Sequence, residues 1–165
     1  MTKTKYLSSY PLPLSMRKRL VVFLLLGALL MVGCIQERKS SAGDYEEFLR
    51  SYLDLLVKGD FDKAANMMLN SSGDPLSGSK KEKWISMVEY AGGVDSYKII
   101  KSEGIDEDAF TSAGAPFKEG KSFTVEISTG GTKTNTTYFV VRYNDKLWIW
   151  LDPLTESLLE MAPSP

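Results

Sequence analysis

The sequence contains no histidine and only one cysteine, Cys34, in 165 residues. Without histidine the chain cannot build a Ser-His-Asp or Cys-His catalytic site, and it lacks a common protein ligand for zinc, copper and iron. A single cysteine cannot form a disulfide bond within the chain. The sequence therefore assigns no catalytic residue, no metal ligand and no cofactor.

The charged residues are unevenly distributed. All 21 Asp and Glu residues follow Cys34, whereas five of the 20 Lys and Arg residues precede it. Residues 34–165 therefore hold 15 basic and 21 acidic residues, a formal net charge of −6. An acidic domain repels nucleic-acid phosphates and anionic lipid surfaces, which argues against nucleic-acid binding and against a polybasic membrane contact.

The apolar run Leu20–Val32 follows the basic residues 17–19 and ends at Gly33-Cys34. A cationic head, a short apolar segment and a small residue at the cleavage position are typical of a secretory signal peptide. About 13 residues span roughly 20 Å as a helix, less than the hydrocarbon core of about 30 Å. The pattern therefore predicts a signal peptide over residues 1–33.

The residues Met31-Val32-Gly33-Cys34 resemble the lipobox of prokaryotic lipoproteins. This resemblance implies cleavage between Gly33 and Cys34 and attachment of a diacylglyceryl group, with palmitate-like chains, to the Cys34 thiol. It implies a cell-membrane protein that is held by lipid and faces outside the cytoplasm. Two alternatives stay open: a free buried thiol in an uncleaved helix, or an ordinary signal cut at another small residue.

The residues after the leader are enough for one compact domain. The polar residues 34–43 predict a lipidated tether, residues 44–152 the folded domain, and residues 153–165 a tail that could hold a short helix. Residues 1–15 lengthen the segment before the apolar run without strengthening its signal-peptide pattern, so we expect translation to begin at Met16.

Helical periodicity marks the first part of the domain. Apolar residues recur at i, i+3, i+4 and i+7 between Tyr45 and Leu56, which predicts one buried helix face. Asp44 is expected to cap this helix, with Glu47 as in a capping box. Gly59 is expected to end it in a left-handed conformation.

Two more helices are expected to follow. Asp60 is expected to cap a second helix over residues 61–69. A capping box at Ser79–Glu82 predicts a third helix, over residues 79–91. The period then changes to two, and four strands are expected over residues 97–101, 122–128, 136–143 and 146–151.

Two tight turns and a loop complete this plan. Thr129–Thr132 and Asn144-Asp145 are typical of hairpin turns. Asp106–Asp108 is expected to lie in a solvated acidic loop, because it lacks the glycine and later glutamate of a calcium loop. The sequence thus predicts an α+β fold, with three N-terminal helices packed on a curved four-stranded antiparallel sheet.

The element order resembles the superfamily that includes nuclear transport factor two and ketosteroid isomerase. Two short motifs carry the resemblance: Leu56–Ala65, similar to a helix–Gly-Asp-aromatic–helix turn of uncharacterised secreted and lipid-anchored members, and Tyr143–Ile149, similar to their closing strands. The resemblance implies a cone-like domain over about residues 44–150 that encloses a pocket. That pocket serves catalysis in some members and ligand binding or dimerisation in others.

Trp84, Trp148 and Trp150 are the candidate residues for a pocket or a partner face, with ordinary core as the alternative. Trp148 and Trp150 share one face of the last strand, opposite Leu147 and Ile149. A strand that is apolar on both faces is either covered twice or meets a partner. This pattern predicts a protein contact, such as a homodimer through the sheet.

Three functions are consistent with these observations. The leading expectation is a lipid-anchored exported module that is not an enzyme and binds a small apolar ligand or an envelope protein. The second is an acid/base enzyme with a carboxylate and a tyrosine in the cone cavity. Against it, Asp60 is expected to serve as a cap, and the strand pattern places Tyr138 and Tyr143 on opposite sides or leaves their sides undetermined. The third is an envelope scaffolding protein without a ligand.

Overall fold

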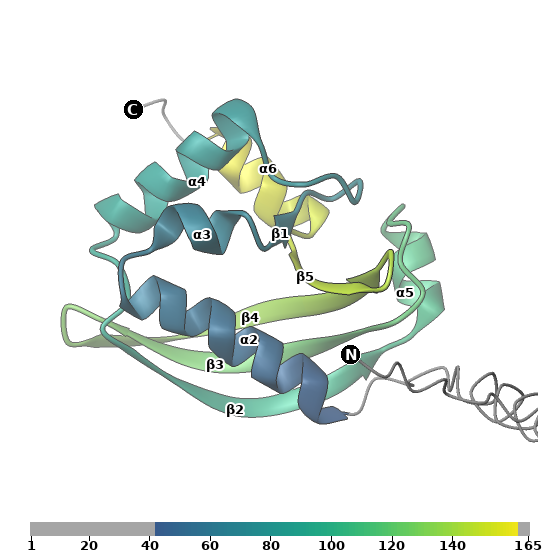
Figure 1. Cartoon of the computed structure of the whole chain (residues 1–165), viewed down its shortest axis with the longest axis horizontal. Coiled ribbons are helices and arrows are strands. Elements are labelled where there is room, and N and C mark those ends of the chain that lie inside the picture. Colours follow the sequence, from purple (N-terminus) through teal and green to yellow (C-terminus); the bar gives the residue numbers. More distant parts are fainter. Residues whose placement is uncertain (1–41, 162–165) are drawn as a thin grey trace, which may run out of the picture. The chain divides into compact units, whose positions relative to one another are not determined.

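The computed structural model describes residues 42–161. Its helices are α2 (Ala42–Val57), α3 (Phe61–Ala65), α4 (Gly78–Tyr90), α5 (Glu107–Ser112) and α6 (Pro153–Met161). Its strands are β1 (Met68–Leu69), β2 (Ser96–Ile105), β3 (Gly120–Thr129), β4 (Thr132–Tyr143) and β5 (Lys146–Trp150). Figure 1 shows their arrangement.

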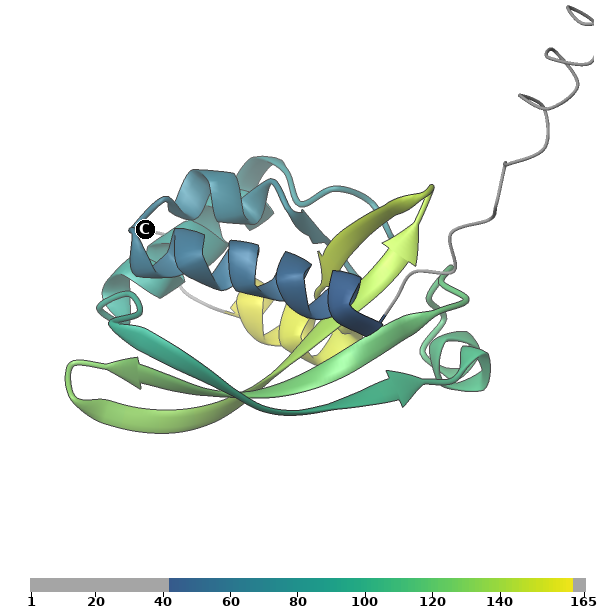
Figure 2. The same cartoon turned by 60° about the horizontal axis from the view of Figure 1, so that its bottom comes forward.

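The five strands form one sheet in the order β1-β5-β4-β3-β2. Strands β2 to β5 are antiparallel, whereas β1 pairs in parallel with β5, with Met68 opposite Ile149 and Leu69 opposite Trp150. Helices α2, α3, α4 and α6 lie on one side of the curved sheet, and α5 lies at one end of it (Figure 2). The α+β class is confirmed, but the sheet is mixed and has five strands, not the four expected.

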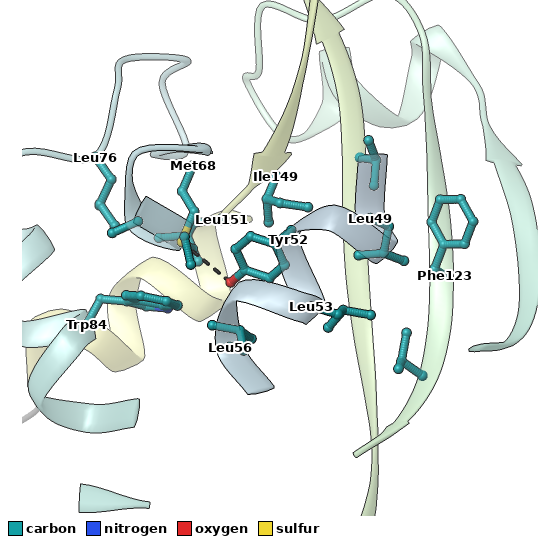
Figure 3. Packing of buried hydrophobic residues seen from close by; sticks show 14 of the residues in the cluster. Leu49, Tyr52, Leu53, Leu56, Met68, Leu76, Trp84, Phe123, Ile149 and Leu151 are labelled. Atoms are coloured by element: carbon teal, nitrogen blue, oxygen red, sulfur yellow. Dashed lines mark hydrogen bonds between the residues drawn. The ribbon is translucent and has the colours of Figure 1, made fainter. Parts of the chain in front are cut away.

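Helix α2 supplies the main contact between the helices and the sheet. Five of its side chains are at most 4% exposed and recur on one face: Tyr45, Leu49, Tyr52, Leu53 and Leu56. Figure 3 shows this face packed against sheet residues that include Phe123 and Ile149. The helical periodicity therefore identified the buried face of α2 correctly.

The ends of α2 differ from the expectation at one point. The helix begins at Ala42, so Asp44 lies in its first turn and not at a cap. Gly59 has φ +74°, as predicted for a left-handed stop. Asp60 occupies the N-cap position of α3 without a side-chain capping bond; its carboxylate pairs instead with Lys63 Nζ at 2.9 Å.

The second predicted helix was too long. It ends at Ala65, and Met68 and Leu69 form β1. Both side chains are buried, and they enter different clusters, Met68 on the helix-covered side of the sheet and Leu69 on the opposite side. Adjacent residues on a strand point to opposite faces of the sheet. A helical pattern places buried residues on one side only, so it does not predict the burial of Met68 and Leu69 on opposite sides.

Two further predictions at helix starts were wrong. Helix α4 begins at Gly78 after the N-cap Ser77, so Ser79 and Glu82 do not form a capping box. Asp106–Asp108, expected in a solvated loop, instead form the N-cap and the start of the short helix α5, Glu107–Ser112. The tail contains a helix, α6, which packs into the core through Leu159.

Both predicted hairpin turns are present. Thr129 pairs with Thr132 around Gly130 and Gly131, whose φ values are +55° and +80°. Asn144 and Asp145 have φ +50° and +61°, the positive values that a two-residue type I′ turn requires. The edge strand β2 contains a register shift between Ile99 and Lys101, which leaves Ile100 49% exposed.

Leu53→Ala is expected to lower the free energy of unfolding by about 2–5 kcal/mol, because Leu53 is fully buried between α2 and the sheet. Urea denaturation measures the change. Val57→Ala is the matched control on the same helix, since Val57 is 40% exposed. A loss below about 1 kcal/mol for Leu53→Ala would contradict its place in the core.

Candidate functional site

The structure separates the three candidate tryptophans. Trp84 is 7% exposed and belongs to the large core cluster beneath the helices (Figure 3). Trp150 is 6% exposed and lies on the other face of the sheet, where Trp148 packs beside it. The three side chains therefore do not line one common site.

A second cluster occupies that other face; we call it the outer aromatic cluster. Its members are Leu69, Phe110, Phe117, Val141 and Trp150, with Phe139, Tyr143 and Trp148 packed against them. The strand register explains where it lies: Phe139 is opposite Trp150, and Val141 is opposite both Gly120 and Trp148. These pairs place the apolar residues of β4 and β5 side by side at one end of the sheet.

Helix α5 and the segment after it cover these residues. Phe110 of α5 is fully buried, and its ring lies edge-on to Phe117 and Trp150 at 5.7 and 5.6 Å. Phe117 also meets Trp150 and Tyr143 at 5.5 Å each, again in edge-to-face geometry. Such ring pairs stabilise packing beyond the area that they bury. The chain thus fills this face with its own side chains.

This packing explains how the last strand, β5, can be apolar on both of its faces. Ile149 faces the helix-covered core, and Trp150 faces the outer aromatic cluster. The strand is therefore covered twice within the chain, and its second apolar face no longer gives a reason to invoke a partner. A homodimer through the sheet stays a prediction without that support.

The interior beneath the helices contains two tyrosines and a thioether. Tyr52 Oη donates to Met68 Sδ at 3.6 Å (Figure 3), and the Tyr52 and Tyr138 rings meet edge-to-face at 5.8 Å. Burial raises the pKa of Tyr138 to about 12 and that of Tyr52 well above its ordinary value. Both hydroxyls stay protonated near pH 7, as an unperturbed tyrosine also does.

Tyr138 and Tyr143 lie on opposite sides of the sheet, one of the two placements that the sequence left open. Tyr138 packs against the core beneath the helices, whereas Tyr143 contacts the outer aromatic cluster. Asp60, the carboxylate weighed for catalysis, pairs with Lys63 at the surface. These groups do not form one site.

The buried carboxylate in residues 42–161 is Glu156 of α6, which is 6% exposed. Its Oε1 pairs with Lys80 of α4, and its Oε2 accepts a hydrogen bond from the Ser71 backbone N–H at 2.7 Å. Lys80 also pairs with Glu160 at 3.0 Å. This charge cluster joins α4, α6 and the loop before α4.

The hydrogen bonds decide the charge state of Glu156. Burial by itself would raise the pKa of this carboxyl, but the bonds from Lys80 and Ser71 outweigh it, and the pKa lies below its ordinary value. Glu156 is therefore ionised near pH 7 and neutralised by Lys80. A carboxylate held in this way serves to fix α6 against α4 rather than to accept a proton.

Sequence reasoning missed Phe110, Phe117 and Glu156. Phe110 lies in a helix of six residues, too short to show a periodic pattern. Two signals were available for α5: the cap residue Asp106, and the acidic residues Glu107 and Asp108 in its first turn, which suit a helix N-terminus. Nothing in the local sequence distinguishes Glu156 from the exposed Glu160.

Several expectations concern residues or groups that the structure does not place. Gly33, Cys34 and the predicted leader lie outside the described residues. Within residues 42–161 no helix is long and apolar enough to span a bilayer. In the same range no group of three or more Cys, His, Asp or Glu side chains is arranged to hold a metal ion.

No protein-family model and no curated protein matches the chain. Among solved structures the chain is similar to a protein from Campylobacter jejuni described as NTF2-like and provisionally as a transpeptidase. The TM-score is 0.41 at 12% sequence identity, and the match covers 65% of this chain and 97% of the other. A similarity at this level carries no inference about activity.

Gly120→Ala is expected to destabilise the domain by about 1–3 kcal/mol. An added Cβ would lie 2.8 Å from Phe110 Cζ and 2.9 Å from the Val140 carbonyl oxygen, and the latter cannot move without shifting the sheet. Thermal or urea unfolding measures the loss. Gly104→Ala is the control, because its Cβ meets nothing within 4 Å; equal effects at both positions would contradict close packing of Phe110 on β3.

Glu156→Gln is expected to lower the free energy of unfolding at pH 7 by about 1–3 kcal/mol, since the charge-assisted bond to Lys80 is lost. Because the folded pKa is depressed, this stabilisation is present above the unfolded pKa and disappears as the pH falls through the folded value. Urea denaturation from pH 7 into the acid range should therefore show the two proteins converging.

Glu160→Gln is the matched control for this prediction. Glu160 contacts the same lysine, but its side chain is 58% exposed, so the expected change is below about 1 kcal/mol. A difference between Glu156→Gln and the unmodified protein that stays constant across the pH series would show that the ionised carboxylate is not the source of the effect.

Proposed function

We propose that the protein is an exported, lipid-anchored module that acts through its surface, by binding rather than by catalysis. The part of this proposal that argues against catalysis rests on the contacts made by polar groups in the interior of the domain. Among residues 42–161, Tyr52 donates to the Met68 thioether, and the buried carboxylate, Glu156, is paired with Lys80 of α4. The acid/base enzyme considered from the sequence would need a carboxylate and a tyrosine directed at one substrate, and among residues 42–161 no carboxylate contact is found for the buried tyrosines Tyr52 and Tyr138.

The packing also favours contacts on the surface over an enclosed ligand. The helix-covered core is filled by large side chains such as Tyr52, Met68 and Phe123, each at most 1% exposed. On the outer face of the sheet, Phe110 of α5 packs into the outer aromatic cluster. Native mass spectrometry of the mature protein from its host is therefore expected to detect no retained small molecule; a stoichiometric ligand would favour the alternative of a pocket.

The anchored part of the proposal rests on the sequence. Met31–Cys34 resembles a lipobox, and Cys34 is the sole cysteine. The acidic residues after it give no electrostatic reason for membrane attachment, so acyl chains are the expected source of affinity. The first described helix begins at Ala42, only eight residues after Cys34.

Cys34→Ser is expected to abolish incorporation of radiolabelled palmitate and to move the protein from the membrane fraction into the soluble fraction. The circular dichroism spectrum of the purified protein should not change, because the substitution lies outside residues 42–161, which hold the helices and strands described above. Ser40→Ala, in the same tether, is the control and should retain both label and fractionation. Equal labelling of Cys34→Ser and the unmodified chain would refute the lipid anchor.

A further inference from the structure

Residues 42–161 contain two Asn-x-Ser/Thr triplets without proline in the middle position, Asn70-Ser71-Ser72 and Asn135-Thr136-Thr137. In exported proteins this triplet is the acceptor pattern for an N-linked oligosaccharide, which is bulky and hydrophilic and therefore needs a surface position. So short a pattern also arises by chance. The surroundings of each asparagine therefore decide whether its carboxamide is open to modification.

The first triplet is built into a turn. The Asn70 Oδ1 accepts hydrogen bonds from the backbone N–H groups of Ser72 and Asp74, at 3.0 and 2.9 Å. The Asn70 backbone N–H donates to the Asp74 carbonyl oxygen at 2.8 Å, and the Ser71 N–H donates to Glu156. Asn70 itself is half-buried. The turn thus fixes the orientation of this carboxamide, which makes the first triplet a poor acceptor.

The second triplet lies open on β4. Asn135 and Thr137 are both exposed, and their side chains lie on the same side of the sheet because alternate residues of a strand share a face. Phe139, two residues further, contacts the outer aromatic cluster, so this side is the outer face. Asn135 is opposite Glu126 of β3, whose carboxylate pairs with Lys133 at 2.8 Å. Among residues 42–161 the Asn135 carboxamide has no hydrogen-bond partner.

We propose that Asn135 carries an N-linked oligosaccharide in the exported protein. The inference rests on the export that the proposed function includes. The donor is a sugar chain joined to a membrane lipid through a diphosphate, and a host transferase outside the cytoplasm uses it. The Asn135 Nδ2 attacks the anomeric carbon, and the N–C bond forms as the C–O bond to the diphosphate breaks. The lipid diphosphate leaves with the bonding electrons, and the amide loses one proton to a base of the transferase.

The fold leaves room for a sugar chain at this position. The first six residues of β4, 132–137, are all exposed. Phe139, where contact with the outer aromatic cluster begins, lies four residues or about 13 Å along the strand from Asn135. Helix α5, which covers that cluster, lies at the opposite end of the sheet from the β3–β4 turn (Figure 2). An oligosaccharide on Asn135 therefore displaces no packed side chain, and it disfavours contact between two copies through this half of the outer face.

Peptide mass spectrometry of the protein isolated from its own host tests the proposal. Trypsin releases residues 134–142, which contain Asn135 and no other asparagine, and residues 64–80, which contain Asn70. We expect peptide 134–142 to carry an added mass made up of whole sugar residues, with fragmentation placing this mass on Asn135. Peptide 64–80 is expected at its unmodified mass.

Four variants make the result specific. Asn135→Gln replaces the acceptor asparagine, and Thr137→Ala removes the hydroxyl of the triplet while the amide stays; both are expected to lose the entire added mass. Thr137→Ser keeps the hydroxyl and is expected to retain the sugar. Asn70→Gln, the matched change in the other triplet, is expected to leave peptide 134–142 modified. The substitutions on β4 replace exposed side chains, and circular dichroism of each variant verifies that the fold is kept.

The proposal is overturned if peptide 134–142 is unmodified or if the sugar is found on Asn70 instead. Persistence of the added mass in Thr137→Ala would also overturn it, because the modification would then not use the triplet. The N-terminal peptide in the same digest reports export separately. An unmodified Asn135 in a protein that begins at Cys34 refutes the oligosaccharide and leaves the proposed function intact, whereas an unmodified chain that retains residues 1–33 refutes both.

Discussion

Burial of β5 on both of its faces is the constraint on which the rest of the structure depends. Ile149 and Trp150 are adjacent, point in opposite directions, and are 2% and 6% exposed. A strand of this kind needs a hydrophobic layer on each side of the sheet. Helix α2 and its neighbours supply one layer, and α5 with Phe117 supplies the other.

Several local features follow from this two-sided requirement. Strand β1 has only two residues, yet Met68 contributes to one layer and Leu69 to the other. Gly120 lacks a side chain where the Phe110 ring approaches β3. The cover on the outer side reaches only one end of the sheet, and the rest of that face carries polar residues such as Thr124 and Thr137, which can remain in water.

The sequence predicted those parts of the fold in which a periodic pattern was long enough to read. The buried face of α2 and the two hairpin turns were predicted correctly. The errors lie in short segments: Met68 and Leu69 fit a helix or a strand equally well, and α5 is shorter than two helical turns. Pairing of Ser71 and Lys80 with Glu156, 85 and 76 residues apart, depends on tertiary structure that no local pattern encodes.

The candidate site was harder to predict than the fold, for a physical reason. Exposed apolar residues and buried ones look alike in a sequence, so Trp148 and Trp150 suggested an open face that α5 in fact covers. The uncovered apolar face belongs instead to α6, where Leu154, Leu158 and Met161 follow the same spacing that a buried helix face would show. Only the packing of Glu156 and Leu159 on the opposite side shows which face is inside.

The register shift in the edge strand β2 affects how readily a strand of another molecule can pair with it. Its outer edge exposes backbone hydrogen-bonding groups along ten residues, a template on which a strand from another molecule could align. The offset at Ile100, with Lys98 and Lys101 beside it, interrupts and charges that edge, which disfavours the addition of a further strand in register. The strand itself thereby opposes edge-to-edge growth into open-ended fibrils.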